Sequence, residues 1–295
     1  MSWLETYRGT VSRWEVDNVD HFTVAFYFAR FEDATLHLLH AIGLDPVALA
    51  GTGRACVTLD CRVRYQRELR VGDVLHIASG VIEVDDGGLV VGHHVFDSAD
   101  GTLCTTVEQR VALVGIGTRA PLPLTPAQRA AARARQIEWS RAPEVVGPPE
   151  PATDDGFIES ARDSIKPGEV DGLGEATLPA YIHRFSAALG HMIAAFGMTP
   201  AYMTEQRRGF STFELKLRVR GALRAGDLVR VRTGLLHVGN SSMRLLQRMQ
   251  NGRTGEAVAS LEQAGVHLDL DARRPTGLPH ALRERAKSLL VGAAG

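Results

Sequence analysis

Two aspartates, Asp17 and Asp171, lie 154 residues apart, and each stands a few residues before a stretch of apolar residues at helical spacing. A carboxylate in this position can act as a general base toward a water molecule, or it can attack a carbonyl carbon itself. The unpaired N–H groups of a helix N-terminus can then stabilise the oxyanion that forms on that carbonyl. A carboxylate in bulk water is a weak base, so a catalytic role requires partial burial.

The simpler interpretation is that each aspartate only caps the helix that follows, a role worth about 1 kcal/mol. We favour catalysis for Asp17, whereas for Asp171 both interpretations stay open. His21, four residues after Asp17, can orient the carboxylate or the water. In the second half Glu175 occupies the place of His21, so we predict one active site and one degenerate site.

The offset of 154 residues relates the whole first half of the chain to the second half, with no insertion needed. Chance matches would scatter over many offsets, whereas a duplicated domain keeps one offset because its loops and elements have equal lengths. The sequence therefore predicts two like domains that pack as a pseudo-dimer. The matching pairs include Asp17/Asp171, Tyr27/Tyr181, Phe31/Phe185, Gly43/Gly197, Gly72/Gly226, Gly80/Gly234 and Gly101/Gly255.

Each half is predicted to contain one long helix followed by strands. Apolar residues recur at helical spacing over residues 27–42 and 181–195, and each run stops near a glycine that suits the position just past a helix end. Residues 57–65 and 212–219 then alternate between apolar and polar side chains, as in a strand with one solvated face. Three more strands follow in each half. A helix followed by four consecutive strands indicates an antiparallel α+β domain.

Three segments are predicted along the chain: an N-terminal domain over residues 1–120, a linker over residues 121–155, and a C-terminal domain over residues 156–295. The linker combines an Ala/Arg/Gln-rich helical piece, residues 126–140, with a Pro-rich run that ends at Pro151. A similar helical piece from Pro279 to Leu290 ends the second half. This appendage is therefore predicted to be duplicated as well.

The composition argues against several classes of partner. The chain has 295 residues, with 33 basic and 34 acidic side chains and a formal net charge of −1, so it lacks the charge bias of a nucleic-acid-binding protein. No run approaches the roughly 20 apolar residues of a membrane span, and the N-terminus does not resemble a signal peptide, so we expect a cytoplasmic protein. The three cysteines lack Cys-x-x-Cys spacing and repeat counterparts, which favours buried thiols. No metal site is predicted, because no second type of ligand clusters with the repeated pair His37 and His191.

The segment from Trp14 to Ala34 resembles the opening motif of the 4-hydroxybenzoyl-CoA thioesterase-like branch of the hotdog superfamily. That motif runs Asp-x-x-Gly-His-x-Asn, followed by an aromatic residue and then by Phe-x-x-Ala. In this chain Asp20 replaces the Gly and Thr23 replaces the Asn. The residues that fit the motif are Asp17, His21, Tyr27, Phe31 and Ala34.

The second half carries the same motif in altered form. It keeps Asp171 and Gly174, but it has Glu175 in place of the His and Thr177 in place of the Asn. Because Gly174 has no side chain, its backbone N–H is approachable as an oxyanion donor. The motif is more specific when doubled at one offset, ahead of a helix and strands in each half, than in either copy alone.

The resemblance implies an α+β double hotdog, in which two antiparallel sheets each wrap round a long central helix and pack as a pseudo-dimer. It also implies an acyl-CoA thioesterase that hydrolyses a thioester of coenzyme A or acyl carrier protein by Asp-assisted attack of water. No cofactor is expected beyond the coenzyme A of the substrate. Simple members of the family place active sites at a dimer interface, so a fused pair would supply both sides. Further assembly into a homo-oligomer stays open.

Several residues are predicted to bind substrate. Arg64 and Arg218 lie on the polar faces of predicted strands, where they could meet the phosphates of coenzyme A, although any solvated strand face has the same pattern. Tyr27 begins an apolar stripe, which favours a place in the core over a hydroxyl that reaches the site. The candidates are Asp17, Asp171 and His21 for catalysis, and Thr23, Tyr27, Gly174, Thr177, Arg64 and Arg218 for substrate binding.

Two other functions remain open from the sequence. A hotdog dehydratase or hydratase would act on a 3-hydroxyacyl thioester, and it would need an acid–base pair that the positions of His21 and Glu175 could provide. A non-catalytic module that binds acyl thioesters, with a motif that has drifted, would account for Asp20, Thr23 and Thr177.

Overall fold

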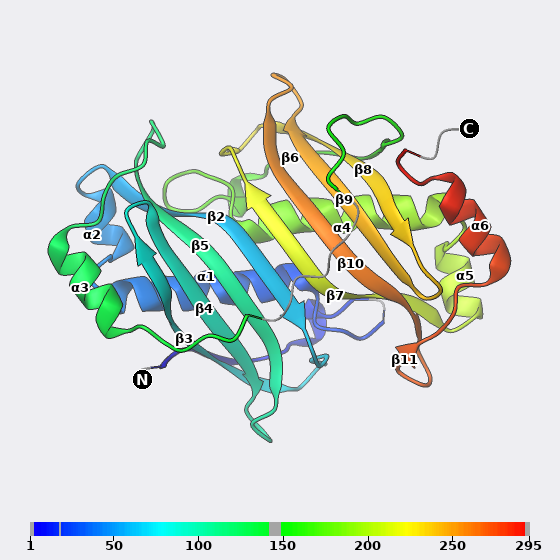
Figure 1. Ribbon diagram of the computed structural model, residues 1–295, viewed down its shortest axis with the longest axis horizontal. Coiled ribbons are helices and arrows are strands. Elements are labelled where there is room, and N and C mark those ends of the chain that lie inside the picture. Colours follow the sequence, from blue (N-terminus) through cyan, green and yellow to red (C-terminus); the bar gives the residue numbers. More distant parts are fainter. Residues whose placement is uncertain (1–2, 18, 142–148, 293–295) are drawn as a thin grey trace. The chain divides into compact units, whose positions relative to one another are not determined.

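The chain divides into two compact units, residues 1–142 and 143–295. The computed structural model describes residues 3–17, 19–141 and 149–292, so residues 142–148 of the predicted linker lie outside the described residues. In each unit a long helix lies across one face of an antiparallel sheet (Figure 1).

The first unit contains a sheet whose strands pair in the order β1-β3-β4-β5-β2, always antiparallel. Its long helix, α1, packs against β1, β3 and β4. The predicted order of one helix and four strands is thus extended by β1, which precedes the helix. The described elements are β1 (Leu4–Thr10), the 3-10 turn η1 (Arg13–Glu15), α1 (Val24–Ala41), α2 (Pro46–Ala50), β2 (Arg54–Tyr65), β3 (Val74–Asp85), β4 (Gly88–Asp97), β5 (Leu103–Gly115) and α3 (Pro126–Ala134).

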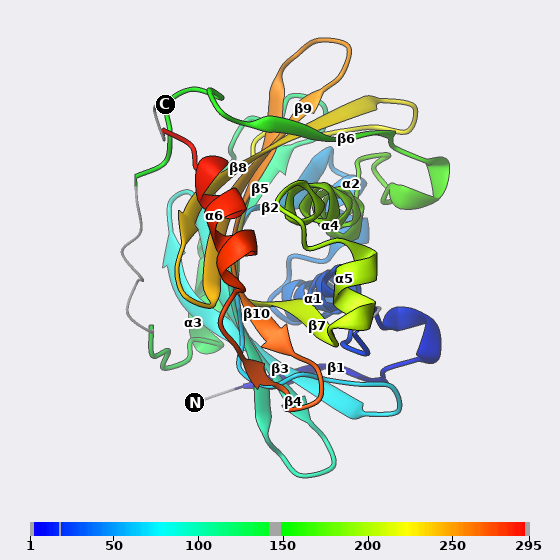
Figure 2. The ribbon, with the colours of Figure 1, turned by 90° about the vertical axis from the view of Figure 1, so that its right-hand side faces the viewer.

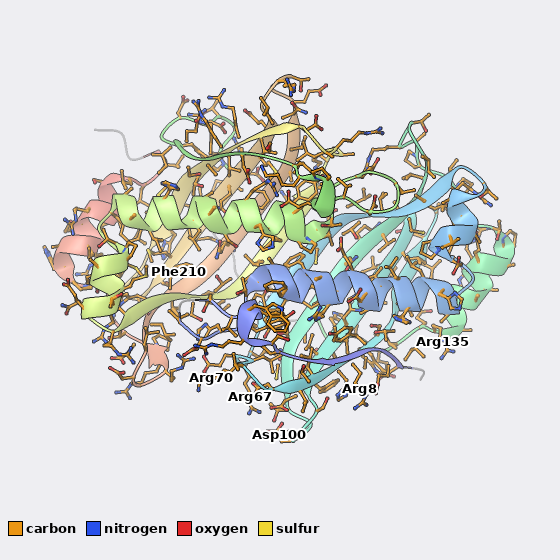
Figure 3. All side chains as sticks on the ribbon, turned by 180° about the vertical axis from the view of Figure 1, so that it is seen from behind. Arg8, Arg67, Arg70, Asp100, Arg135 and Phe210 are labelled. Atoms are coloured by element: carbon orange, nitrogen blue, oxygen red, sulfur yellow. The ribbon has the colours of Figure 1, made fainter. Side chains whose placement is uncertain are left out.

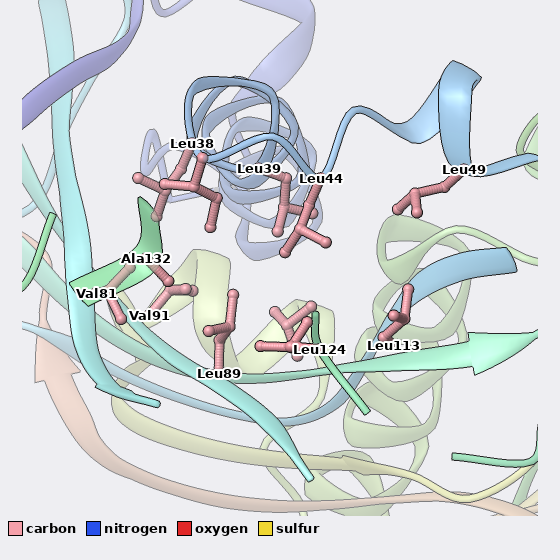
Figure 4. Close-up of a cluster of buried hydrophobic side chains, with 12 residues drawn as sticks. Leu38, Leu39, Leu44, Leu49, Val81, Leu89, Val91, Leu113, Leu124 and Ala132 are labelled. Carbon is pink, nitrogen blue, oxygen red and sulfur yellow. The ribbon is translucent and has the colours of Figure 1, made fainter. Parts of the chain in front are cut away.

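Apolar side chains hold the C-terminal half of α1 against the sheet. Leu38 and Leu39 of α1 belong to one buried cluster with Val81 of β3 and Ala132 of α3 (Figure 4). The helix ends as predicted at Gly43, which has a φ of +75°. The N–H of the next residue donates to Leu39 O over 2.8 Å, a bond that satisfies a carbonyl at the helix end and requires the left-handed backbone of the glycine.

The second unit has strands in the order β7-β10-β9-β8-β6, with β11 paired to β10. Its long helix, α4, packs against β6 and β8. Figure 2 shows α4 nearly end-on, with the sheet of its unit beside it. The described elements are β6 (Ile158–Ser164), the 3-10 turn η2 (Pro167–Glu169), α4 (Leu178–Ala195), α5 (Pro200–Glu205), β7 (Arg208–Val219), β8 (Leu228–Val238), β9 (Ser242–Asn251), β10 (Ala257–Asp269), β11 (Arg274–Pro275) and α6 (His280–Ser288).

The first and last residues of several elements also repeat at the predicted offset of 154 residues. Both ends of α1 and α4, of β2 and β7, and of α3 and α6 differ by 154. Both long helices begin three residues before the predicted start at Tyr27 and Tyr181. Val24 and Leu178 stand three residues before these tyrosines, at the spacing of the same apolar stripe, so the stripe extends one turn further than predicted.

The predicted helical piece over residues 126–140 is shorter than expected, because α3 ends at Ala134. The chain then becomes extended and lies against β3, where Ile137 N donates to Val81 O over 2.9 Å. A Cβ on Gly80 would lie 2.4 Å from Ile137 Cγ2, so only glycine fits beneath this extended segment. The second unit repeats the arrangement, since a Cβ on Gly234 would lie 2.6 Å from Val291 Cγ2. Close packing of the extended segment therefore explains why both units have glycine at this position.

The predicted alternation of the strand over residues 57–65 is interrupted. The register of β2 against β5 jumps between Thr58 and Asp60, so Leu59 is the extra residue of a β-bulge. The register of β7 against β10 jumps in the same way at Phe213, which is exposed although the pattern placed it on the apolar face. Even this irregularity is duplicated, because Leu59 and Phe213 are 154 residues apart.

A chain of buried hydrogen bonds crosses the core of the first unit. Its centre is His93 on β4, which is fully buried and lies 2.6 Å from Ser79 Oγ through Nδ1 and 3.2 Å from Thr35 Oγ1 through Nε2. Because Thr35 donates its own proton to Gln109 Oε1, His93 Nε2–H is the donor to Thr35. Burial lowers the pKa of His93 to about 4, so the neutral form prevails near pH 7. The whole chain runs through Thr6, Ser79, His93, Thr35, Gln109 and Thr58.

The second unit has Gln247 at the position of His93. Its Nε2 donates to Phe185 O over 2.8 Å, and the neighbouring hydroxyls of Ser160 and Thr233 lie 2.7 Å apart, as the corresponding pair does in the first unit. Glutamine supplies a donor and an acceptor, as neutral histidine does, but it does not take up a proton. The core of the first unit is therefore titratable at a place where that of the second unit is not.

Replacing His93 by the residue of the second unit, His93→Gln, is expected to remove part of the acid sensitivity of the first unit. Burial lowers the pKa of His93 from 6.5 to about 4. The stability that depends on neutral His93 is therefore present above pH 6.5 and is lost as the pH falls toward 4, by up to about 3 kcal/mol at about 1.4 kcal/mol per pKa unit. Urea unfolding across this pH range would measure the difference.

The matched control is Gln247→His, which should introduce the same dependence into the second unit. Equal slopes of unfolding free energy against pH for the wild type and His93→Gln would contradict the prediction.

Candidate active site

The segment before α1 folds back on itself and is held closed by Asp17. Its Oδ1 accepts hydrogen bonds from the backbone N–H groups of Val19 (2.9 Å) and His21 (3.0 Å). The backbone N of Asp17 donates to His21 O over 2.9 Å. At the base of the loop, Thr23 N donates to Glu15 O over 2.8 Å, so α1 starts directly where the loop closes. A short carboxylate that bonds backbone N–H groups ahead of it in the chain is a common way to stabilise such a turn.

The second unit builds the same loop. Asp171 Oδ1 accepts hydrogen bonds from the N–H groups of Leu173 (2.8 Å) and Glu175 (3.0 Å). Thr177 N donates to Glu169 O over 3.0 Å at the base. The same loop thus forms with either His or Glu four residues after the aspartate.

Both aspartates are exposed, which contradicts the expectation of a partly buried carboxylate at Asp17. The physical reason is that the short side chain bonds to the backbone of its own surface loop and does not reach into the core. The aspartates do not cap the long helices either, because Thr23 and Thr177 hold the N-cap positions and, within the described residues, the aspartates bond only to N–H groups inside their loops.

His21 has an ionic partner that the sequence did not reveal. Its Nε2 lies 2.7 Å from Oε2 of Glu68, which stands in the loop after β2, and the imidazole is largely buried. Arg70, which is labelled in Figure 3, lies nearby. Its Nε is 4.0 Å from Oε1 of Glu68. The second unit has Glu175 and Ala222 at the positions of His21 and Glu68. Glu68 was missed because it lacks a counterpart at the repeat offset.

A second ion pair ties each loop to its helix. Glu15 Oε1 accepts a hydrogen bond from Arg30 Nη2 (2.5 Å), and Glu169 Oε2 accepts one from Arg184 Nη2 (2.7 Å). The Arg184 guanidinium holds the pKa of Glu169 below its usual value. The sequence analysis missed these residues, although both pairs recur at the offset of 154. Charged pairs at the repeat offset were the signal that could have found them.

The N-termini of the two long helices differ in their donors. Thr23 and Thr177 hold the N-cap positions, but within the described residues neither side chain makes a capping hydrogen bond. The N–H groups of a first turn have no acceptor inside their own helix. In α1 these groups include the N–H of Ala25, whereas α4 has Pro179 at the same position, which has no N–H. Only α1 therefore offers this donor.

The remaining candidate residues lie away from the loop tip. Tyr27 is buried in the core, as the pattern favoured, and its ring lies 4.4 Å from that of Phe22. Gly174 lies within the loop of the second unit, between Asp171 and the N-cap. Arg64 is half-buried on β2, opposite Thr106, and Arg218 is exposed on β7 with Nη1 2.9 Å from Glu150 Oε2.

Within residues 3–17, 19–141 and 149–292, no three His, Cys, Asp or Glu side chains come together in a way that could hold a metal ion. Cys61 and Cys104 are buried free thiols, and Cys56 is half-buried. In the same part of the chain, the helices are all too short or too polar to cross a membrane.

Comparison with known sequences identifies the family of this chain. The model of the thioesterase-like superfamily matches the chain twice, over residues 11–132 and 165–286, and the two matches are again 154 residues apart. The chain therefore belongs to the thioesterase-like superfamily, and the resemblance predicted from the doubled motif is confirmed. A betainyl-CoA thioesterase of Pseudomonas aeruginosa is 29% identical over 113 residues, which cover 38% of this chain and 71% of that protein.

Solved thioesterases share the fold. The crystal structure assigned to an oleoyl thioesterase of Lactobacillus plantarum has a TM-score of 0.70 and 14% sequence identity, covering 90% of this chain and 96% of that one. An acyl-ACP thioesterase of Bacteroides thetaiotaomicron has a TM-score of 0.68 and 12% identity, covering 88% of this chain and 96% of that one. The protein is thus an α+β double hotdog of the thioesterase family.

The backbone of the loop explains why the family motif has a glycine. Gly174 has a φ of +75°, and Asp20 at the same position of the first unit has a φ of +61°. This left-handed conformation is unfavourable for residues with a Cβ, although less so for Asp than for most. The first unit keeps the turn despite the substitution, because Asp17 closes the same loop.

The variant Asp20→Gly is expected to raise the free energy of unfolding by about 1 kcal/mol, since it relieves the left-handed strain. The variant loses the exposed ion pair between Asp20 and Arg13, whose charged atoms lie 3.4 Å apart. Such a pair contributes little to stability, so its loss offsets only part of the gain. Gly174→Asp is the matched variant and should lower stability by a similar amount. Urea unfolding would measure both, and a loss of stability in Asp20→Gly would refute the explanation.

Proposed function

We propose that this protein is an acyl-CoA thioesterase, which hydrolyses an acyl thioester to a free acid and coenzyme A. Membership of the thioesterase-like superfamily supports the reaction. The observation that carries the assignment to specific residues is the loop of the first unit, where an exposed carboxylate leads into a helix whose N-cap side chain, Thr23, makes no capping hydrogen bond.

In the proposed reaction Asp17 activates the attacking water. Its Oδ1 is tied to the loop, and Oδ2 has no hydrogen-bond partner among the described residues, so this oxygen is available to accept a proton. The water oxygen attacks the thioester carbon as its proton passes to Oδ2. The first-turn N–H groups of α1 stabilise the oxyanion. Collapse breaks the C–S bond, and the departing thiolate takes the proton from Asp17.

The exposure of Asp17 limits its strength as a base in the free protein. A bound acyl-CoA would displace water from the loop, and removal of water strengthens both the base and the electrostatic contribution of the helix N-terminus. His21 is proposed to orient the water or the carboxylate, held by Glu68. Thr23 is proposed to bind the substrate at the helix start.

The first unit is the proposed active one. It has His21 with its partner Glu68, whereas the second unit has Glu175 and Ala222 at these positions. It also has the backbone N–H of Ala25 in the first turn of α1, whereas the equivalent residue of α4 is Pro179, which has no N–H. The corresponding loop of the second unit is proposed to bind the substrate without being fully active. This loop contains Asp171, Gly174 and Thr177.

We further propose that residues 1–120 and 156–295 form the two hotdog domains, with residues 121–155 as the segment that joins them. Arg64 and Arg218 are proposed to meet the phosphates of coenzyme A. Coenzyme A is preferred to acyl carrier protein because the relative found by sequence is a CoA thioesterase, and the balanced net charge is compatible with a cytoplasmic enzyme.

Asp17→Asn is expected to lower kcat by about 100-fold or more, because the amide loses the basic carboxylate. The amide oxygen can still accept the two loop N–H groups, so the loop should stay folded. Turnover of an acyl-CoA panel, followed with a thiol reagent, would measure the effect. Asp171→Asn is the control and should lower kcat much less.

If Asp17→Asn and Asp171→Asn together leave turnover unchanged, the proposed mechanism is wrong. Addition of water to an enoyl-CoA without release of thiol would instead indicate a hydratase. Tight acyl-CoA binding with no product would indicate a binding module.

Ala25→Pro is expected to lower kcat by roughly 100-fold, because it removes one donor to the oxyanion. Proline is tolerated in the first turn of a helix, and α4 carries Pro179 at this position with equivalent helix bounds. Circular dichroism and the unfolding midpoint should therefore stay close to wild type. Pro179→Ala is the matched control, and an unchanged kcat in Ala25→Pro would remove the helix N-terminus from the mechanism.

A further inference from the structure

Three hydroxyl groups gather behind the catalytic loop of the first unit. Tyr65 at the end of β2 and Thr105 on β5 are register partners across the sheet. The Tyr65 ring packs edge-on against the ring of Tyr27 from α1, with centroids 5.1 Å apart. The Tyr27 hydroxyl lies close to the Thr105 side chain and the Leu69 backbone, although burial raises the pKa of Tyr27 overall.

Two of these hydroxyls are shielded from water without a hydrogen-bond partner. Tyr65 OH and Thr105 Oγ1 are buried atoms that make no hydrogen bond of acceptable geometry within the described residues. Leaving a buried polar group unpaired costs about 1–3 kcal/mol, so such groups are rare unless something else satisfies them. Burial raises the pKa of Tyr65 well above its usual value, so its hydroxyl is protonated and can donate.

The second unit shows that the fold itself does not need these hydroxyls. Its corresponding register pair is Val219 and Ala259, which are both apolar and buried. Its counterpart of Tyr27 is Tyr181, whose hydroxyl donates to Gly221 O over 3.0 Å. The second unit therefore satisfies or removes each polar group at this place, whereas the first unit keeps two unsatisfied.

The hydroxyl cluster adjoins the loop that carries Asp17. Phe22, next to His21, packs its ring 4.4 Å from the Tyr27 ring, and its N–H donates to Leu69 O over 2.8 Å. Tyr65 as a whole residue is only half-buried, so the cluster lies just beneath the surface of the unit. An acyl group whose thioester carbon lies at the start of α1 could reach it.

We propose that Tyr65 and Thr105 form a subsite for an oxygen-bearing substituent on the acyl group of the substrate. A hydroxyl or carbonyl oxygen of the ligand would accept from Tyr65 or Thr105, and a ligand hydroxyl could also donate to either, since both side chains can donate and accept. An unsubstituted alkyl chain would leave both groups unpaired and desolvated. This proposal rests on the proposed thioesterase activity and adds the substrate class, an oxygenated acyl-CoA.

The test compares hexanoyl-CoA with its 3-, 4-, 5- and 6-hydroxy derivatives. For the wild type, at least one derivative is expected to exceed hexanoyl-CoA in kcat/KM by about tenfold or more, since a site built to bind a hydroxyl discriminates strongly against its absence. In the double variant Tyr65→Phe and Thr105→Val, which removes both hydroxyls with little change of shape, this ratio is expected to fall toward one.

Stability gives a second readout. Because Tyr65→Phe removes an unpaired group, its urea midpoint in the absence of substrate is expected to rise or stay constant. Tyr181→Phe is the matched control. It loses a satisfied hydrogen bond, so its midpoint should fall while the hydroxy-to-alkyl ratio stays at the wild-type value.

The outcomes separate the two proposals. If the wild type hydrolyses none of the five thioesters or any of a wider acyl-CoA panel, the thioesterase proposal itself fails. If it hydrolyses them with equal kcat/KM, or if a preference survives unchanged in the double variant, the hydroxyl subsite is wrong while the thioesterase proposal stands.

Discussion

The structure around the candidate site depends on one interaction, the acceptance of two backbone N–H groups by a single aspartate oxygen. Asp17 and Asp171 each make these bonds at 2.8–3.0 Å, and each closes a loop that delivers the chain to the first turn of a long helix. The ion pairs from η1 to α1 and from η2 to α4 then fix the base of each loop to its helix. Without the aspartate, four otherwise paired backbone N–H groups would need water or another partner.

The two copies share their framework, and several of their differences lie around the start of the long helix. Element bounds, β-bulges, terminal helices and buried hydroxyl pairs all recur at one offset. Most of the differences described above lie within a few residues of the start of α1 or on the strand ends beside it. The differing pairs are His21/Glu175, Ala25/Pro179, Glu68/Ala222, Tyr65/Val219 and Thr105/Ala259.

Much of the fold followed from the sequence because repetition and periodicity are global signals. The repeat offset predicted the duplication, the glycines at the ends of the apolar runs predicted where the long helices end, and the doubled motif predicted the family. The β-bulges at Leu59 and Phe213 were missed because a bulge adds a residue without altering composition. The exposure of Asp17 was missed because burial depends on where the loop packs, and Glu68 was missed because contacts between loops leave no pattern in one sequence. The unpaired hydroxyls became visible only through the register of β2 and β5.

The extended segment that follows α3 has a consequence for assembly. Trp139 lies over Gly92, where a Cβ would come within 2.7 Å of the indole. Its ring centroid lies 4.8 Å from that of His94, and Trp3 stacks on His94 with centroids 4.4 Å apart. Aromatic rings of the same chain thus cover this part of the sheet. A neighbouring molecule that approached from this direction would therefore contact aromatic rings and not the strands beneath them.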